Sequence, residues 1–172
     1  MIESFRFYNV SEKDMDFELV LTRMKDFMKK DPRSRYVLSI GTDSHVHQTE
    51  TRFITAIHLH RVGKGAWGCL RNYNVKRPLK SIREKISLET SFSQEIAYLF
   101  SPEDLADLTE IILPYADEGA DLTIEIHLDI GSRGATKELI QDMTGRITAM
   151  GLEAKIKPES YAAFSYANRY TK

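Results

Sequence analysis

Hydrophobic residues recur at two different periods along the chain, and their alternation predicts a mixed α/β protein. In residues 11–30, apolar side chains recur at helical spacing behind Ser11 and Asp14, which are spaced as a capping pair. Other runs are short, apolar and β-branched, which is typical of buried strands. We expect helices over 11–30, 79–100, 103–115 and 158–170, with another ending at 150, and strands over 36–42, 52–62, 66–75, 122–130 and 153–157.

The order of these elements predicts the topology of the sheet. The second and third strands are separated only by a glycine turn at 63–65, so the first three strands should form an antiparallel meander. The last two strands each follow a helix, which implies parallel pairing. No repeat or linker-like segment interrupts the pattern. We therefore expect one domain over residues 1–172, with a five-stranded mixed sheet, flanking helices and an extra N-terminal helix.

Composition narrows the functional classes. Of the 172 residues, 42% are hydrophobic and 28% are charged, and the formal net charge of −1 gives no overall basic field. A single cysteine, Cys69, excludes an internal disulfide framework and a paired-cysteine zinc site. The sequence shows no apolar run of membrane-spanning length and no signal-peptide pattern at its start. We expect a cytoplasmic protein without a membrane partner.

Charge is distributed unevenly along the chain. Residues 61–85 carry eight Lys or Arg against one acid, whereas residues 101–129 carry nine acids and no Lys or Arg. One interpretation of the basic stretch, which is interleaved with Trp67 and Tyr73, is a surface that binds the phosphates of nucleic acid. The other is a solvated hairpin and helix start. Its basic residues are Arg61, Lys64, Arg71, Lys76, Arg77, Lys80, Arg83 and Lys85.

Three carboxylates occupy positions where a core would otherwise be apolar. Asp43 directly follows the first strand, and Asp129 lies near the end of the fourth. Ligands bind at strand C-termini in open α/β sheets. With about 100° of rotation per residue, Glu89 falls in the middle of the apolar stripe of helix 79–100. That stripe comprises Ile82, Ile86, Phe92, Ile96, Leu99 and Phe100.

A buried carboxylate is costly unless it is paired or binds a metal. Asp43, Glu89 and Asp129 together suit an oxygen-ligated Mg²⁺ or Mn²⁺. Two such ions can activate water and stabilise the leaving oxygen of a phosphodiester. The alternative for Glu89 is a buried ion pair with Lys85, one helical turn earlier, and for each aspartate a turn or capping role.

Histidines add further candidates to this region. His45 and His47 lie in the run DSHVH, and His58 and His60 alternate along the second strand. Clusters of Asp and His also suit Mn²⁺ or Zn²⁺. We expect His58 and His60 to be strand-surface residues, and His45 and His127 to contact the metal or the substrate.

The glycine-bearing loop at 131–134 precedes a helix. Its backbone N–H groups would bind phosphate in one interpretation, and it is a plain strand-to-helix turn in the other. The sequence has no GxSxG elbow, and Cys69 has no evident histidine partner. Chemistry based on a nucleophilic triad is therefore not expected.

Four segments together resemble the YkuK-like family of ribonuclease H-like proteins, a family classed as uncharacterised. They are GTDSHV (41–46), REKISLET (83–90), HLDIGSRGAT (127–136) and KPESYAAFSYANRYTK (157–172). The resemblance covers nearly the whole chain. It implies a ribonuclease H-like fold: a five-stranded mixed sheet with its first three strands antiparallel and helices on both faces.

The resemblance also implies roles for the three carboxylates. Ribonuclease H-like nucleases carry an Asp on the first strand, a Glu on the first helix after the third strand and an Asp at the fourth strand, which correspond to Asp43, Glu89 and Asp129. A fourth acid often comes from the C-terminal helix, where this sequence offers Glu159 and Asn168. Asn168 departs from the pattern because it is a weaker, neutral metal ligand.

The leading interpretation is a metal-dependent phosphodiesterase, a nuclease that uses Mg²⁺ or Mn²⁺. One alternative is a nucleic-acid-binding module with weak or lost catalysis, and another is a partner-binding protein that dimerises through its hairpin edge. RNA, DNA, hybrid and junction substrates stay open, as does the oligomeric state. The expected substrate-binding residues are Lys85, Arg133, His45, His127, Lys76 and Arg77.

Overall fold

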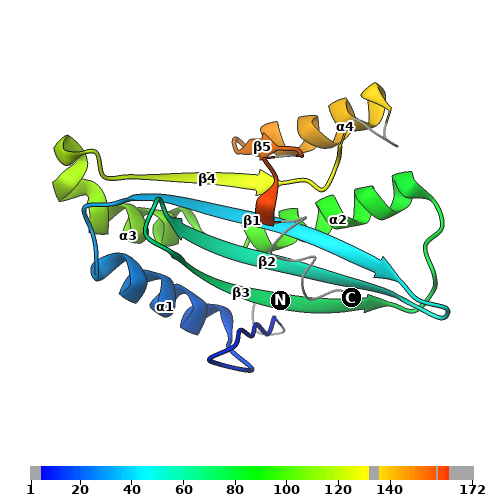
Figure 1. The fold of residues 1–172 in the computed structure, drawn as a ribbon, viewed down its shortest axis with the longest axis horizontal. Helices are drawn as coiled ribbons and strands as arrows, with labels where there is room; N and C mark the ends of the chain where they lie inside the picture. The colour runs from blue at the N-terminus through cyan, green and yellow to red at the C-terminus, as the bar shows by residue number, and fades with distance from the viewer. Residues whose placement is uncertain (1–4, 132–135, 158, 163–172) are drawn as a thin grey trace.

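The computed structural model describes residues 5–131, 136–157 and 159–162, and a five-stranded sheet runs through it (Figure 1). The strand order is β3-β2-β1-β4-β5. β1 pairs antiparallel with β2, as does β2 with β3, whereas the β1–β4 and β4–β5 pairs are parallel. The mixed sheet predicted from the sequence is therefore confirmed. Its strands are β1 Arg35–Val46, β2 Thr51–Arg61, β3 Ala66–Val75, β4 Asp121–His127 and β5 Glu153–Lys155.

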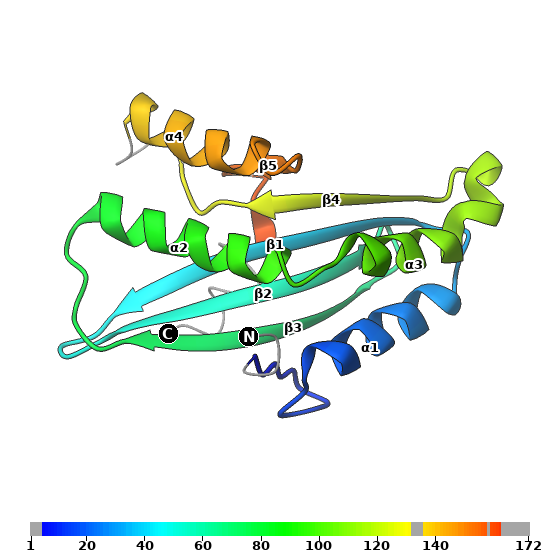
Figure 2. The same cartoon turned by 180° about the vertical axis from the view of Figure 1, so that it is seen from behind.

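Helices cover one face of the sheet and the β4–β5 edge. From behind, α2 and α3 lie across the strands, and α1 lies beside β3 (Figure 2). α4 is held to α2 by the Arg146 guanidinium, which donates to Ser91 and Gln94 at 2.8 Å each. None of the described helices is long and apolar enough to cross a membrane. The helices are α1 Phe17–Lys29, α2 Ile82–Ala97, α3 Pro102–Ile112 and α4 Lys137–Thr148, with a short 3₁₀ helix, η2 Leu113–Glu118, after α3.

The side chains of β1 that face α2 change from apolar to polar along the strand. Leu38 and Ile40 are fully buried in the core, as the alternation of a half-covered strand requires. Two and four residues further on, the same side carries Thr42 and Ser44, which are also buried. The core therefore gives way to a buried polar region near the end of β1.

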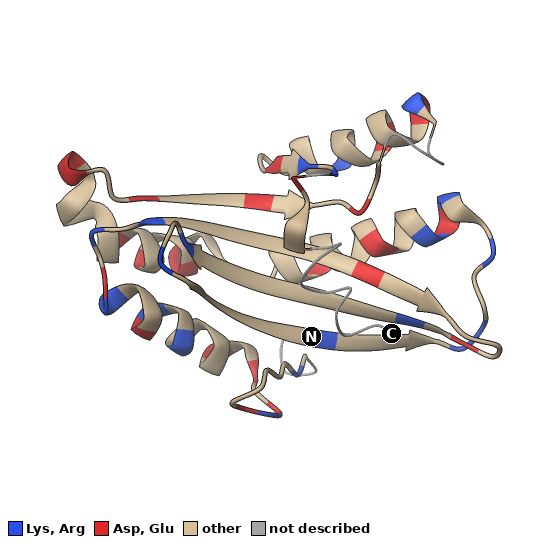
Figure 3. Ribbon diagram, viewed as in Figure 1, with Lys and Arg blue, Asp and Glu red and all other residues tan. Residues whose placement is uncertain are grey.

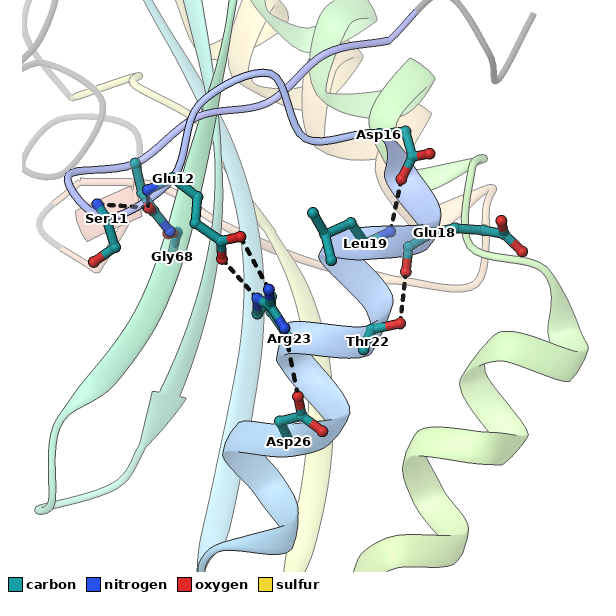
Figure 4. Close-up of polar contacts among 10 residues, drawn as sticks. Ser11, Glu12, Asp16, Glu18, Leu19, Thr22, Arg23, Asp26 and Gly68 are labelled. Atoms are coloured by element: carbon teal, nitrogen blue, oxygen red, sulfur yellow. Dashed lines mark hydrogen bonds and ion pairs between the residues drawn. The ribbon is translucent and has the colours of Figure 1, made fainter.

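The start of the first helix differs from the prediction. Ser11 and Asp14 do not cap it; the helix begins at Phe17, and the side chain of Asp16 accepts a hydrogen bond from the Leu19 N–H at 2.8 Å (Figure 4). The Asn9 side chain accepts from the N–H groups of Ser11 and Glu12 and holds this segment in a turn. A turn stabilised by Asn9 competes with helix formation, so the helix starts later than the pattern predicts.

Residues 5–15 form an N-terminal strap along the edge of β3. Tyr8 and Leu70 exchange two backbone hydrogen bonds, of 2.9 and 2.8 Å, and Phe7 pairs with Met15 inside the strap. The side chains of Phe5, Phe7 and Met15 are buried. The strap therefore closes one side of the core and covers the middle of the edge strand.

Other boundaries also differ from the prediction. β1 runs to Val46, so Asp43 lies within the strand and does not follow it. α2 is shorter than 79–100, and Ile82, its first residue, is 52% exposed rather than part of the buried stripe. β4 ends at His127, so Asp129 lies past the strand. The last strand ends at Lys155. Most of the predicted helix 158–170 lies outside the described residues.

Candidate functional site

The site lies where β1 and β4 separate. Their last pair is Gly41 with His127, and β1 then continues beside β2 alone up to Val46. Asp43 lies two residues past that pair on β1, and Asp129 two residues past it on the chain that leaves β4. Because the two strands are parallel, both aspartates are at the C-terminal end of these strands, on the part of the sheet that α2 crosses (Figure 2).

Glu89 is the buried carboxylate at the centre of this region. It lies in the middle of α2 with 5% of its surface exposed, and one carboxylate oxygen accepts a hydrogen bond from Ser44 Oγ at 2.5 Å. Burial raises the pKa of Glu89 to about 8, and the charges of Asp43 and Asp129 add to this. The Ser44 hydrogen bond and the Lys85 charge act in the opposite direction. The raised pKa favours the protonated form of Glu89 when no cation is nearby.

A chain of hydroxyl groups joins β1 and β2 to α2. Thr42 Oγ1 lies 2.8 Å from both Thr55 Oγ1 and Ser93 Oγ, and Ser44 bonds Glu89 as described above. Thr42 and Ser44 are not among the site residues predicted from the sequence. Glu89 and Ser93 are four residues apart, so both polar side chains lie on the buried face of one helix. Buried polar groups need hydrogen-bond partners, and this requirement could have pointed to polar residues on the strand that the helix covers.

Asp43 approaches the site from the other side of β1. Thr42 and Ser44 face α2, so strand alternation directs the side chain of Asp43 away from the helix. The residue is 5% exposed, and its charge still acts on Glu89.

Asp129 is paired with a lysine. Lys157 Nζ lies 2.9 Å from Asp129 Oδ1, and the two side chains are 45% and 18% exposed. Asp129 and Glu89 line the same narrow pocket, together with Thr42, Ser93 and His127. Asp43 does not line that pocket. Glu89 is the carboxyl group whose pKa the charges of both aspartates raise.

The donor atoms suit a hard divalent cation, because the acidic side chains offer only oxygen ligands. A cation would also relieve the effect of the two neighbouring charges on buried Glu89. Within the described residues, no three His, Cys, Asp or Glu side chains lie close enough together to hold an ion as they stand. The three carboxylates are thus electrostatic neighbours rather than a formed coordination shell.

Two of the predicted substrate-binding residues, Lys85 and His45, differ in how they are placed. Lys85 is half-buried and is not within ion-pair distance of Glu89 in the part of the chain that the structure describes. His45 is exposed near the end of β1, opposite Arg52 on β2, and its ring packs edge-on against His47 at 4.8 Å. His45 is therefore accessible to a ligand that approaches the end of the sheet.

His127 has both ring nitrogens engaged within the protein. Nδ1 accepts from the Ala162 backbone N–H at 3.0 Å, so the ring proton lies on Nε2, which is 2.7 Å from Glu125 Oε1. The residue is 1% exposed. His127 thus connects the end of β4 to the segment at Ala162, and a bound substrate would have to displace one of these bonds to reach its nitrogens.

His58 and His60 are not strand-surface residues as predicted. Both are partly buried, and both pack against the ring of Tyr161, with centroids 5.4 and 6.2 Å away. Burial, reinforced by the neighbouring histidines, lowers the pKa of His58 to about 4. The reason for the difference is a long-range contact, since Tyr161 lies some hundred residues further along the chain.

The basic stretch 61–85 does not form one continuous surface. Figure 3 shows its Lys and Arg residues spread out, at the β2–β3 turn, on β3, on the connection from β3 to α2 and at the start of α2. Arg61 lies over the Phe27 ring and donates to the Tyr36 hydroxyl, and Arg71 lies over Phe5. The side chains of these two arginines are therefore engaged in contacts within the fold.

The connection from β3 leads into α2, the helix that carries Glu89. Lys76 and Lys80 are exposed, and neither has an ion pair among the described residues. Arg77 forms a two-pronged pair with Glu84, at 3.2 and 2.7 Å. Lys76 and Lys80 are therefore the residues of the stretch that are available to an anionic ligand.

Two expected residues, Arg133 and Asn168, lie outside the described residues, as does most of the loop 131–134. Glu159 is described: its side chain is 69% exposed and lies 3.6 Å from Lys155. In the structure as it stands, this carboxylate belongs to a surface ion pair.

Replacing Ser44 by alanine should raise the pKa of Glu89 still further, because the hydrogen bond from Ser44 favours the ionised carboxylate. The titration of the Glu89 side-chain carbon by NMR would measure the change. Ser93→Ala is the matched control, since Ser93 bonds Thr42 and not Glu89. An unchanged Glu89 titration in Ser44→Ala would contradict the role given to Ser44.

Comparison with known proteins adds two findings. The family model described as "Ribonuclease H-like" matches residues 19–172. The chain is also 64% identical over 172 residues to the "Uncharacterized protein YkuK" of Bacillus subtilis (strain 168), and the alignment covers 100% of both proteins. Both matches span the strand ends and the helix that carry the three carboxylates.

Proposed function

Because the chain belongs to the ribonuclease H-like family, in a YkuK-like branch of it, we propose that it is a metal-dependent phosphodiesterase that acts on nucleic acid. Asp43, Glu89 and Asp129 would hold Mg²⁺ or Mn²⁺. The observation that carries the proposal is Glu89, a carboxylate buried in the middle of a helix and under the influence of two aspartates. Carboxylates are rarely grouped in this way unless a cation or a proton compensates their charge.

A divalent ion bound to these carboxylates would activate water and stabilise the charge that develops on the phosphodiester. The protein's own residues supply position and attraction. The Ser44 hydroxyl orients Glu89, and the Glu125–His127 pair fixes the end of β4 next to Asp129. Exposed Lys76 and Lys80 would bind the backbone phosphates, with Lys85 and His45 nearer the carboxylates.

The direct test is cleavage of labelled single strands, RNA–DNA hybrids and four-way junctions in Mg²⁺, Mn²⁺ or EDTA. Turnover that requires the metal supports the proposal. Binding without turnover under all conditions would favour a second candidate, a nucleic-acid-binding module. A specific observation favours that candidate: Lys157 already neutralises Asp129.

Neutralising Lys76 and Lys80 together should weaken binding to all nucleic-acid sequences alike, because phosphates carry no sequence information. Each lost phosphate contact should reduce the slope of log K against log[salt] by about 0.7–0.9. Fluorescence polarisation at several salt concentrations would measure the slope. A Lys29→Ala/Lys30→Ala variant, with two exposed lysines at the end of α1, is the control. Equal slopes for both variants would remove Lys76 and Lys80 from the interface.

A further inference from the structure

Arg52, on β2, is a half-buried cation whose guanidinium group has no acceptor in the described part of the chain. No described side chain or carbonyl group accepts a hydrogen bond from it, and no described carboxylate lies within ion-pair distance. A guanidinium group carries five N–H donors, and half-buried donors without acceptors are costly. Arg52 therefore has donors available for a ligand. The other half-buried arginines of the described residues each donate to an acceptor of the protein; they are Arg23, Arg61, Arg71 and Arg146.

The side chain of Arg52 points away from α2. Side chains alternate along a strand, and the neighbouring Phe53 packs against Phe92 of α2, with ring centroids 4.8 Å apart. Figure 2 views the sheet from the α2 side, so Arg52 lies on the far face. This is also the face toward which strand alternation directs Asp43.

Strand register places three hydrogen-bonding side chains in a line on that face, which we call the His45–Arg52–Asn74 row. His45 of β1 is the register partner of Arg52, and Arg52 is that of Asn74 on β3. Register partners in antiparallel strands share a face, with Cβ atoms about 5 Å apart. His45 and Asn74 are exposed. The row is therefore accessible to solvent on both sides of the arginine.

The row lies between one of the candidate site carboxylates and an exposed lysine. Asp43 comes two residues before His45 on the same face of β1, at a Cα separation of about 7 Å. Lys76 comes two residues after Asn74, where the chain leaves β3, and it is exposed. An anionic chain that contacts the row could therefore extend toward Asp43 on one side and toward Lys76 on the other.

We propose that the His45–Arg52–Asn74 row binds the sugar–phosphate backbone of a nucleic-acid strand, with Arg52 on a phosphate group. A guanidinium group matches two phosphate oxygens at once, whereas the amide and the imidazole can donate to sugar or base atoms. The exposed imidazole ring also offers a face on which a base can stack. The inference rests on the proposed function, since it takes nucleic acid as the ligand, but it requires no metal. It places the bound strand on the face of the sheet opposite α2.

The test is binding of labelled DNA and RNA single strands by the full chain in EDTA, measured by fluorescence polarisation at several salt concentrations. Arg52→Gln should weaken binding roughly tenfold at low salt. It should also reduce the slope of log K against log[salt] by about 0.7, the effect of one lost phosphate contact on a single strand. Asn74→Ala should weaken binding and leave the slope unchanged, because a neutral amide releases no counterion. Arg35→Gln is the matched control, since Arg35 is exposed at the other end of β1 and has no ion pair among the described residues.

A second measurement separates a binding role of Arg52 from a structural one. Because its guanidinium group has no acceptor among the described residues, Arg52→Gln should leave the melting temperature unchanged or raise it. Arg52→Lys keeps the charge, so it should keep the salt slope and lose part of the affinity, since lysine lacks the planar two-pronged contact. A clear fall in the melting temperature of Arg52→Gln would assign the residue to the fold and overturn the inference.

The binding results also separate this inference from the proposed function. If the wild type binds the strands and Arg52→Gln behaves like Arg35→Gln, the row is overturned alone. If a poly-glutamate peptide binds as tightly as the strands, with the same loss in Arg52→Gln, the row takes an acidic protein segment and the assignment to nucleic acid is wrong. If the wild type binds no strand even at low salt, the row and the proposed function both fail.

Discussion

Glu89→Gln should stabilise the metal-free protein at pH 8–9 and remove most of the loss of stability that we expect for the wild type between pH 5 and 8. The pKa of Glu89 is raised from 4.5 to about 8 in the folded protein. Below its unfolded value both states are protonated, and burial of the neutral acid carries no ionisation penalty. As the pH rises, the unfolded chain releases the proton first, so the free energy of unfolding falls until the folded pKa is passed.

The size of this effect is on the order of a few kcal/mol, since one pKa unit corresponds to about 1.4 kcal/mol. Glutamine has nearly the same shape, can still accept the hydrogen bond from Ser44 and does not ionise. Urea unfolding in EDTA from pH 5 to pH 9 would measure the difference. Glu110→Gln, at an exposed position on α3, is the matched control. A wild-type stability that does not fall over this pH range would show that Glu89 ionises freely.

Asp43→Asn should abolish metal-dependent cleavage while sparing nucleic-acid binding. Loss of one metal-ligating carboxylate removes several kcal/mol of transition-state stabilisation, which is a decrease of about 10³-fold or more in kcat. The melting temperature in EDTA should hardly change, because the substitution also removes a charge that acts on Glu89. Cleavage and polarisation assays on the same preparation would separate the two effects.

Asp121→Asn serves as the control for Asp43→Asn, because Asp121 is an exposed aspartate at the start of β4, at the other end of the same sheet. Cleavage retained by Asp43→Asn would mean that Asp43 is not a ligand. A large fall in its melting temperature would instead assign Asp43 a structural hydrogen-bond role.

The parts of the fold that depend on local pattern could be predicted from the sequence. The β-branched run that became β2 and the glycine turn before β3 carry their own signals, and the position of Glu89 on the stripe of α2 indicated its burial. The strap could not be predicted in this way. It depends on the Asn9 turn and on Tyr8 meeting Leu70, contacts that no periodicity records.

In the site, too, some residues could be predicted from the local sequence pattern, and others depend on long-range contacts. Asp43, Glu89 and Asp129 stood out because each is a charge at a position that should be buried or at a strand end. Ser44 and Lys157 are ordinary polar residues in the sequence, and only the three-dimensional contacts reveal the hydrogen bond to Glu89 and the ion pair with Asp129. His58 and His60 were misplaced for the same reason, since their burial depends on Tyr161.

The N-terminal strap has a consequence for self-association. An edge strand with open N–H and C=O groups is a template on which another chain can add a strand. At Leu70, the middle of β3, both backbone groups are already bonded to Tyr8 of the same molecule, and Asn9 caps the carbonyl of Gly68. A dimer built by adding strands along this edge would first have to displace the strap and expose Phe5 and Phe7 to water. The chain thus carries its own blocking strand, which disfavours open-ended sheet extension from this side.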